Sequence, residues 1–277
     1  MLARTQPLPA PAPLAIRFTE NPAHAGTTRT HRPRHPCPAL VCSMNPVAHA
    51  RASARRFGGD WKDYLPAHAF IDQSKVLTAS PSHQLFLHHA DVGAALLELC
   101  VDPVQTTGNQ VAWSDDILAQ HLDEDFGWQP RLVDWLDALD PEQLPAHGTG
   151  DVPPGVALFR DNPAAYALVR WGGSEENYRP LLSLLDYPAR DTDHPAAPWL
   201  LHNTAGLFIA EAVLGPEIIL GDSASVPTRV VAEFFIHAMA GNMMDAGVIA
   251  AALDVQPWMT GRASRPAPLV TGGKWQA

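Results

Sequence analysis

Apolar residues recur along most of the chain at spacings of three and four, which predicts helices. Prolines, paired glycines and capping residues mark where these helices start and stop. Two short polar stretches, "TTGNQVAW" and "IILGDSASV", favour turns or small hairpins between helices. The helices expected in the first half are residues 46–56 before the paired glycines 58–59, a helix after Pro66, residues 80–100, residues 114–127 and a helix after Pro130.

The predicted helix 80–100 contains "HQLFLHHADVG", three histidines within seven residues. Ser80 suits its N-cap and Pro81 its first turn. On a helical wheel, His83 falls opposite the apolar face and is expected at the surface. His88 lies on the edge of that face and His89 lies within it. The apolar face itself is made by Leu85, Val92, Leu96 and Leu99.

The chain contains an internal repeat. The segment "FGGDWKDYLPAHAFID" (57–72) aligns without a gap with "WGGSEENYRPLLSLLD" (171–186), at a constant offset of 114. After one deletion, "HADVGAALLE" (89–98) aligns with "HNTAGLFIAE" (202–211). The sequence therefore predicts an all-α fold of two tandem, similar helical bundles, joined by short turns or small hairpins.

The repeat sets the predicted domain boundaries. A first helical repeat spans 46–145, a linker spans 146–159, a second and degenerate repeat spans 160–260, and a tail spans 261–277. Residues 1–43 are rich in proline and carry five arginines against one acidic residue, Glu20. We expect them to be a disordered extension or a non-native leader, with the true start at Met44, because globular patterning begins there.

Composition narrows the classes of function. Residues 44–277 carry 14 basic and 28 acidic residues, and such a body repels phosphate backbones, so nucleic acid is not an expected partner. No stretch reaches the 18 or so apolar residues that span a bilayer. Three cysteines build no disulfide framework, and Cys100 is expected to be a buried thiol. A cytoplasmic protein with a protein partner, or a homo-oligomer, fits this composition.

Five spaced segments of the first copy carry a resemblance. They are "ARRFGG", "DYLPAHAFIDQSK", "LHHADVG", "QHLDEDFGWQP" and "DWL". In this order they resemble a family of short bacterial domains of unknown function, over about residues 46–140. The resemblance implies a compact bacterial protein that starts near Met44, and it implies no activity.

Comparing the two copies separates the histidines into two groups. His89 and His202 share one position, next to Gly93 and Gly206, so both are interpreted as packing residues. Glu98 and Glu211 are also shared, at an exposed or ion-paired edge or at the contact between the copies. Four other histidines are replaced by apolar residues in the second copy: His68 by Leu182, His83 by Ala196, His88 by Leu201 and His121 by Phe235.

This loss of imidazole groups suggests a metal site in the first copy. Neutral imidazole and carboxylate are ligands of Zn²⁺, Mn²⁺ or Fe²⁺. His121 and Asp125 are spaced to share one helical face. The candidate ligands are His68, His88, His121, Asp125 and Asp72. Drift of partly exposed histidines into a hydrophobic interface is the alternative explanation.

The sequence leaves two functions open. The first is a metal-binding and hydrolytic domain, because the order of its histidines is similar to that of HD-type phosphohydrolases. "HHAD" nevertheless lacks the adjacent His-Asp pair that this class uses. The second is a non-catalytic protein interaction module built from a duplicated bundle. Whether the chain is an enzyme stays open.

Overall fold

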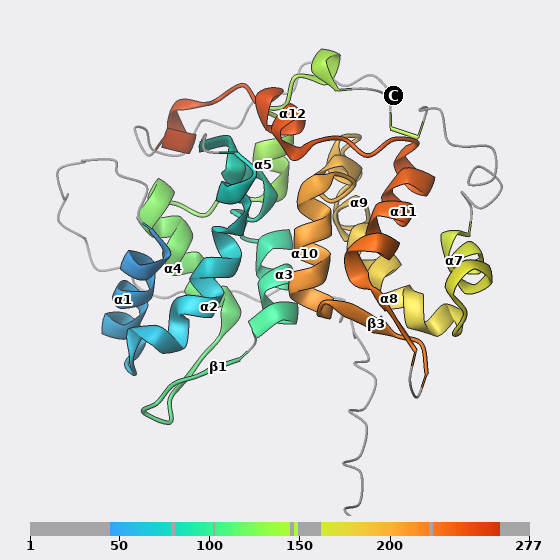
Figure 1. Ribbon diagram of the computed structural model, residues 1–277. Helices are drawn as coiled ribbons and strands as arrows, with labels where there is room; N and C mark the ends of the chain where they lie inside the picture. Colours follow the sequence, from blue (N-terminus) through green and yellow to red (C-terminus); the bar gives the residue numbers. More distant parts are fainter. Residues whose placement is uncertain are drawn as a thin grey trace, which may run out of the picture. The chain divides into compact units, whose positions relative to one another are not determined.

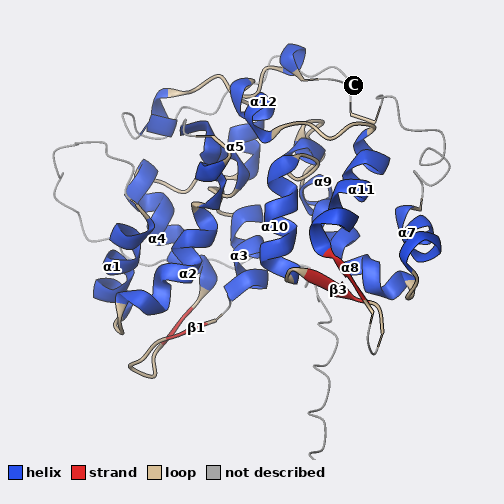
Figure 2. Cartoon of the chain, viewed as in Figure 1, coloured by secondary structure: helices blue, strands red, loops and turns tan. Residues whose placement is uncertain are grey.

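The computed structural model describes residues 45–260 except 79–80, 102, 145–146, 149–161 and 222–223. The fold is mostly helical, as predicted, with two small antiparallel hairpins (Figures 1 and 2). The predictions for the leader 1–43, the tail 261–277, the N-cap Ser80 and most of the linker 146–159 fall outside the described residues. Among the described residues, no helix has the length and apolar character needed to cross a bilayer.

The first repeat is built from short helices in a fixed order. Its elements are α1 (Pro46–Phe57), α2 (Trp61–Ile71), the 3-10 helices η1 (Gln73–Val76) and η2 (Pro81–Phe86), α3 (Val92–Val101), the strands β1 (Val104–Gln105) and β2 (Val111–Ala112), α4 (Ser114–Phe126), α5 (Leu132–Leu136) and η3 (Pro141–Gln143).

The second repeat follows nearly the same order, which confirms the tandem duplication. Its elements are α7 (Pro163–Trp171), α8 (Glu175–Leu185), α9 (Tyr187–Asp191), η4 (Ala197–Leu200), α10 (Thr204–Leu214), the strands β3 (Glu217–Ile219) and β4 (Ser225–Pro227), α11 (Thr228–Ala240), α12 (Ala246–Ala251) and η5 (Pro257–Thr260).

The same local interactions end the first helix of each repeat. Gly58 and Gly172 follow these helices with φ of 85° and 82°, a region that favours glycine. The Tyr64 hydroxyl donates a hydrogen bond to the Gly58 carbonyl at 2.8 Å, and the Tyr178 hydroxyl does the same to Gly172. The paired glycines therefore terminate helices, as the sequence predicts.

Two predicted helix boundaries are wrong. The second helix starts at Trp61, five residues before Pro66, because Asp60 and Asp63 form a capping box there. The predicted helix 80–100 is two elements, η2 and α3, separated by an irregular link, residues 87–91. The His88 N–H of this link still donates to the Gln84 carbonyl of η2 at 2.9 Å, but the next part of its backbone bonds to a distant segment. The Ala90 N–H donates to the Pro130 carbonyl at 2.7 Å.

The two repeats meet along their equivalent third helices. Helices α3 and α10 pack against each other (Figure 1). The Cys100 thiol at this contact lies 3.5 Å from the Ala212 carbonyl oxygen. Cys100 is partly buried, and burial raises the pKa of its thiol. Glu211 pairs with Arg229, while Glu98 is exposed. Within the described part of the chain, Glu211 therefore forms an ion pair and Glu98 does not.

Candidate metal centre

Four polar atoms of the first repeat converge in its interior. His121 and Asp125 lie one turn apart on α4, His88 lies in the link before α3, and Asp72 directly follows α2. His121 Nε2 is 3.1 Å from His88 Nε2, 3.3 Å from Asp125 Oδ2 and 3.7 Å from Asp72 Oδ1. His88 Nε2 is 3.4 Å from Asp72 Oδ1 and 3.6 Å from Asp125 Oδ2.

Each of these five separations is close to the distance between two ligands of one tetrahedral metal ion. Nitrogen and oxygen ligands about 2.0–2.2 Å from a zinc ion lie about 3.3–3.6 Å from each other when arranged tetrahedrally. The five separations run from 3.1 to 3.7 Å. All four residues belong to the set that the sequence predicts, and they come from three separate segments. A cation at the centre of this group would contact two imidazoles and two carboxylates.

The protonation states at this centre suit a cation. Burial lowers the pKa of the His88 imidazole to about 3, so the ring is neutral and its nitrogen keeps a lone pair. Burial opposes ionisation of Asp72 and Asp125, but their interactions with His88 and His121 outweigh it and lower both pKa values. Both carboxylates are therefore charged at neutral pH. Lys75, 2.8 Å from Asp72, balances part of this charge.

His68 is not one of the converging groups, although the sequence suggests it as a ligand. Its Nδ1 lies 3.0 Å from Nδ1 of His121, and its Nε2 lies 2.8 Å from Ser53 Oγ. Burial lowers the pKa of His68 to about 2, so the ring is neutral. Because the neutral His68 ring donates its Nε2–H to Ser53 Oγ, its Nδ1 accepts a hydrogen bond from the Nδ1–H of His121. This arrangement leaves the Nε2 lone pair of His121 directed at the centre.

The hydrogen bonds continue from Ser53 along α4. Ser53 Oγ donates to Gln120 Oε1 at 3.3 Å, and Gln120 Nε2 donates to Glu124 Oε1 at 2.8 Å. On the other side, the Trp135 indole N–H donates to the His88 carbonyl at 2.9 Å. Such partners fix the orientation of ligating side chains in metal sites. His68 therefore orients the ring of His121, while Trp135 holds the backbone at His88.

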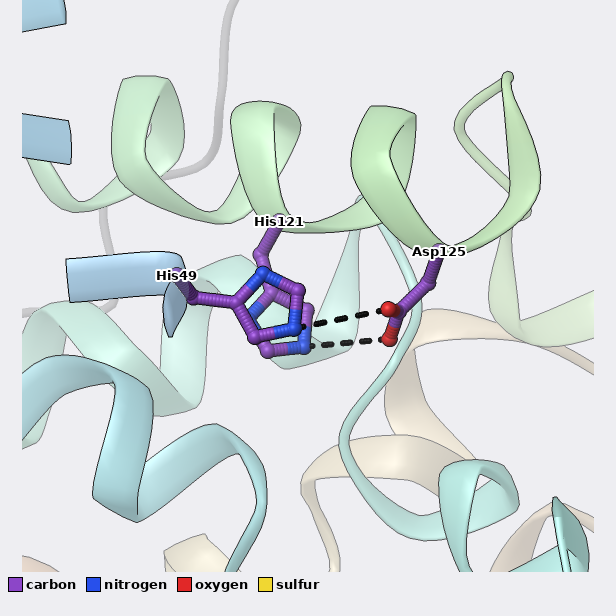
Figure 3. A group of neighbouring side chains, drawn as sticks. All are labelled: His49, His121 and Asp125. Carbon is purple, nitrogen blue, oxygen red and sulfur yellow. Dashed lines mark ion pairs between the residues drawn. The ribbon is translucent and has the colours of Figure 1, made fainter. Parts of the chain in front are cut away.

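His49 on α1 is a site residue that sequence reasoning missed. Its ring stacks on that of His121 with centroids 3.9 Å apart, and its Nε2 faces Asp125 Oδ1 at 3.4 Å (Figure 3). His49 Nδ1 bonds to Glu124 Oε2 at 2.7 Å. Burial opposes protonation, but the two carboxylates outweigh it and raise the pKa of His49 to about 9. Protonated His49 therefore links Glu124 to Asp125.

The comparison of the two copies also gives a signal that could have identified His49 as a site residue. At the repeat offset of 114, Pro163 stands in its place in the second copy. The partners of the network are replaced by apolar residues in the same way: Ser53 by Ala167, Gln120 by Phe234, Glu124 by Ala238 and Asp125 by Met239. Only Asp72 keeps its carboxylate, as Asp186.

The prediction that His83 is a surface residue is wrong. Its side chain is buried in η2, and a ring nitrogen lies within 4.8 Å of ligand atoms of Asp72 and His88. The error follows from the continuous helix that the sequence suggested, because a 3-10 helix turns its residues through different angles. His89 is buried and its Nδ1 accepts the Gly93 N–H at 2.7 Å, as expected of a packing residue.

Comparisons with known proteins give one family. The model of the family described as Domain of unknown function (DUF6915) matches residues 44–144 and, a second time, residues 162–259. Both copies of the repeat are therefore recognised, including the one whose polar network is replaced. The comparison with curated proteins and that with solved structures give no match.

Proposed function

We propose that this chain, which belongs to the DUF6915 family through both of its repeats, binds one divalent metal ion in its first repeat. The observation that carries the proposal is the close approach of His88 Nε2 and His121 Nε2 to each other and to one oxygen each of Asp72 and Asp125, at 3.1–3.7 Å. Nitrogen and oxygen ligands in this geometry suit Zn²⁺ first, with Mn²⁺ and Fe²⁺ as competitors. Among its described residues the second repeat offers no such group, because the positions equivalent to His88, His121 and Asp125 are apolar and only Asp186 keeps a carboxylate.

The number of protein ligands bears on the role of the ion. A hydrolytic zinc site uses three protein ligands and leaves the fourth position to water, whereas a structural site uses four. The group here supplies four ligands, and their side chains are almost fully buried. The arrangement therefore supports an ion that stabilises the fold of the first repeat rather than one that activates water for hydrolysis.

Metal analysis of the purified full chain tests the proposal. The protein is stripped with a chelator, loaded with Zn²⁺ and assayed for bound metal and for affinity against a chromophoric chelator. We expect one ion per wild-type chain and none in His121→Ala. His202→Ala is the matched control, because it also removes a buried imidazole, but from the second repeat. Equal binding by His121→Ala and the wild type would overturn the proposal.

A further inference from the structure

An approximate two-fold relationship joins the ends of the two repeats. Leu139 and Leu253, 114 residues apart and therefore equivalent, form an antiparallel bridge with each other. The Asp140 N–H donates to the Ala252 carbonyl at 2.9 Å, and the equivalent Asp254 N–H donates to the Ala138 carbonyl at 2.8 Å. Two equivalent residues bond to each other in this way when a local two-fold axis passes between them.

Beyond this bridge, the end of each repeat packs on the other repeat. From the linker that follows the first repeat, the Gly148 N–H donates to the Ala240 carbonyl, and His147 stacks on His202 and packs edge-on against Trp199. From the second repeat, η5 packs against α4 of the first, and α12 packs against η2. The elements that carry His83, His121 and Asp125 are thus covered by the second repeat.

Trp258 on η5 is the central side chain where the second repeat packs on the first. Its ring centroid lies 4.8 Å from that of Trp135, 5.2 Å from Trp128 and 5.9 Å from Phe126. All three partners belong to the first repeat, and Trp258 is 3% exposed. Aromatic contacts of this size contribute large packing energies. Trp258 therefore fixes an aromatic cluster that is otherwise made entirely by the first repeat.

This aromatic cluster adjoins the candidate metal centre. Phe126 directly follows Asp125 on α4, and its ring lies 6.2 Å from the ring of His88. Trp135 donates its indole N–H to the His88 carbonyl, and it is the partner closest to Trp258. Displacing Trp258 therefore loosens the contacts that hold His88 and Asp125, two of the four converging residues.

We infer that Trp258 is a positioning residue of the metal centre, and that the second repeat serves as an internal partner that completes the site of the first. The inference rests on the proposed metal binding. It gives the second repeat a role although three of the four equivalent positions there are apolar: it supplies the half of the two-fold arrangement that the first repeat needs. Loss of the polar network from the second repeat leaves this role intact.

The test compares two tryptophans of equal burial in the full chain. Trp258 and Trp199 are each 3% exposed, but Trp199 lies on η4 and contacts His147 instead of the aromatic cluster. Each is replaced by Phe, Leu and Ala. Zn²⁺ affinity is measured by chelator competition at a temperature where circular dichroism shows native helix content. The absorption bands of the Co²⁺-substituted protein report ligand geometry, and thermal melting reports stability.

We expect Trp258→Ala to weaken Zn²⁺ binding about 10–100-fold, the usual effect of losing an outer-shell support, and to alter the Co²⁺ bands. Trp258→Phe should restore most of the affinity. The Trp199 variants should melt earlier but bind Zn²⁺ as the wild type does. If Trp258→Ala does not fold, the Leu and Phe variants give the graded comparison.

Three outcomes would overturn the inference. Unchanged affinity and Co²⁺ bands in the folded Trp258 variants, or equal losses in both series, would show that Trp258 has a general packing role only. A wild-type chain that binds none of the metals tested would overturn the proposed function and this inference together. Metal binding by the wild type and by Trp258→Ala with equal affinity would overturn the inference alone.

Discussion

Asp72 and Asp186 occupy the same position of the repeat but lie in opposite environments. The Asp72 side chain is 2% exposed and its Oδ1 lies 3.4 Å from Nε2 of His88. The Asp186 side chain is 48% exposed and its Oδ1 lies 3.6 Å from Nε2 of His202. A buried carboxylate is costly unless it is paired, so Asp72 depends on the surrounding imidazoles and cations. The carboxylate alone does not make a site.

The pair gives a first prediction with a built-in control. Asp72→Asn keeps the size of the side chain but removes its charge, so we expect Zn²⁺ affinity to fall by more than the 10–100-fold typical of an outer-shell loss. Asp186→Asn should bind Zn²⁺ as the wild type does. Titration of the stripped protein with Zn²⁺ in the presence of a competing chelator measures both. An equal effect of the two substitutions would contradict the assignment.

The second prediction concerns stability. An ion that binds only the folded chain adds about 2.7 kcal/mol to the free energy of unfolding when its free concentration is 100 times its dissociation constant. For a body of this size, that corresponds to a rise in Tm of about 5–10 °C. Differential scanning calorimetry of the stripped and Zn²⁺-loaded protein measures the rise. His121→Ala should show none, and a rise in that variant would place the ion elsewhere.

The third prediction concerns His49. Its Nε2 faces the oxygen of Asp125 that does not face His121, so we assign it an outer-shell role (Figure 3). His49→Ala should weaken Zn²⁺ binding about 10–100-fold while one ion still binds per chain at saturation. His237→Ala, which removes a histidine from α11, is the control. Loss of all metal from His49→Ala would make His49 a ligand instead.

The fold could be predicted largely because the chain contains two copies. Identical residues at a fixed offset, such as the paired glycines, revealed the duplication without any assumption about local geometry. The third helix was wrong because its interruption depends on distant residues. The Ala90 N–H and the His88 carbonyl bond to Pro130 and Trp135, and these contacts compensate the backbone for the missing helical bonds.

The difference between comparing the two copies and judging local helix geometry also explains which parts of the site could be predicted. His88 and His121 are indicated by the loss of both imidazoles from the second copy, whereas Asp125 is indicated by its spacing from His121 and Asp72 by its place one turn after His68. His83 is also replaced in the second copy, by Ala196, but the helical phase predicts a surface position for it, and that phase is wrong. His68 follows the same pattern of loss as the ligand candidates, because an outer-shell partner becomes useless together with the ligand that it supports.

The last prediction concerns the close approach of helix and link that both copies share. A methyl group at Gly206 would lie 1.9 Å from the Leu201 carbonyl oxygen, and one at Gly93 would lie 2.4 Å from the Leu87 carbonyl oxygen. Both atoms belong to the backbone, which cannot move aside as a flexible side chain can. We expect Gly206→Ala to cost about 1–3 kcal/mol of unfolding free energy, as overpacking usually does. Gly221→Ala is the control, because a methyl group there meets nothing within 4 Å. Urea denaturation measures both variants, and equal stability of the two would contradict the packing role.

Metal binding should distinguish the two shared glycines. Gly206 lies far along the chain from the candidate ligands, in the repeat that lacks them, so Gly206→Ala should keep one Zn²⁺ per folded chain. Gly93 lies four residues after His89, so Gly93→Ala should lose Zn²⁺ affinity as well as stability.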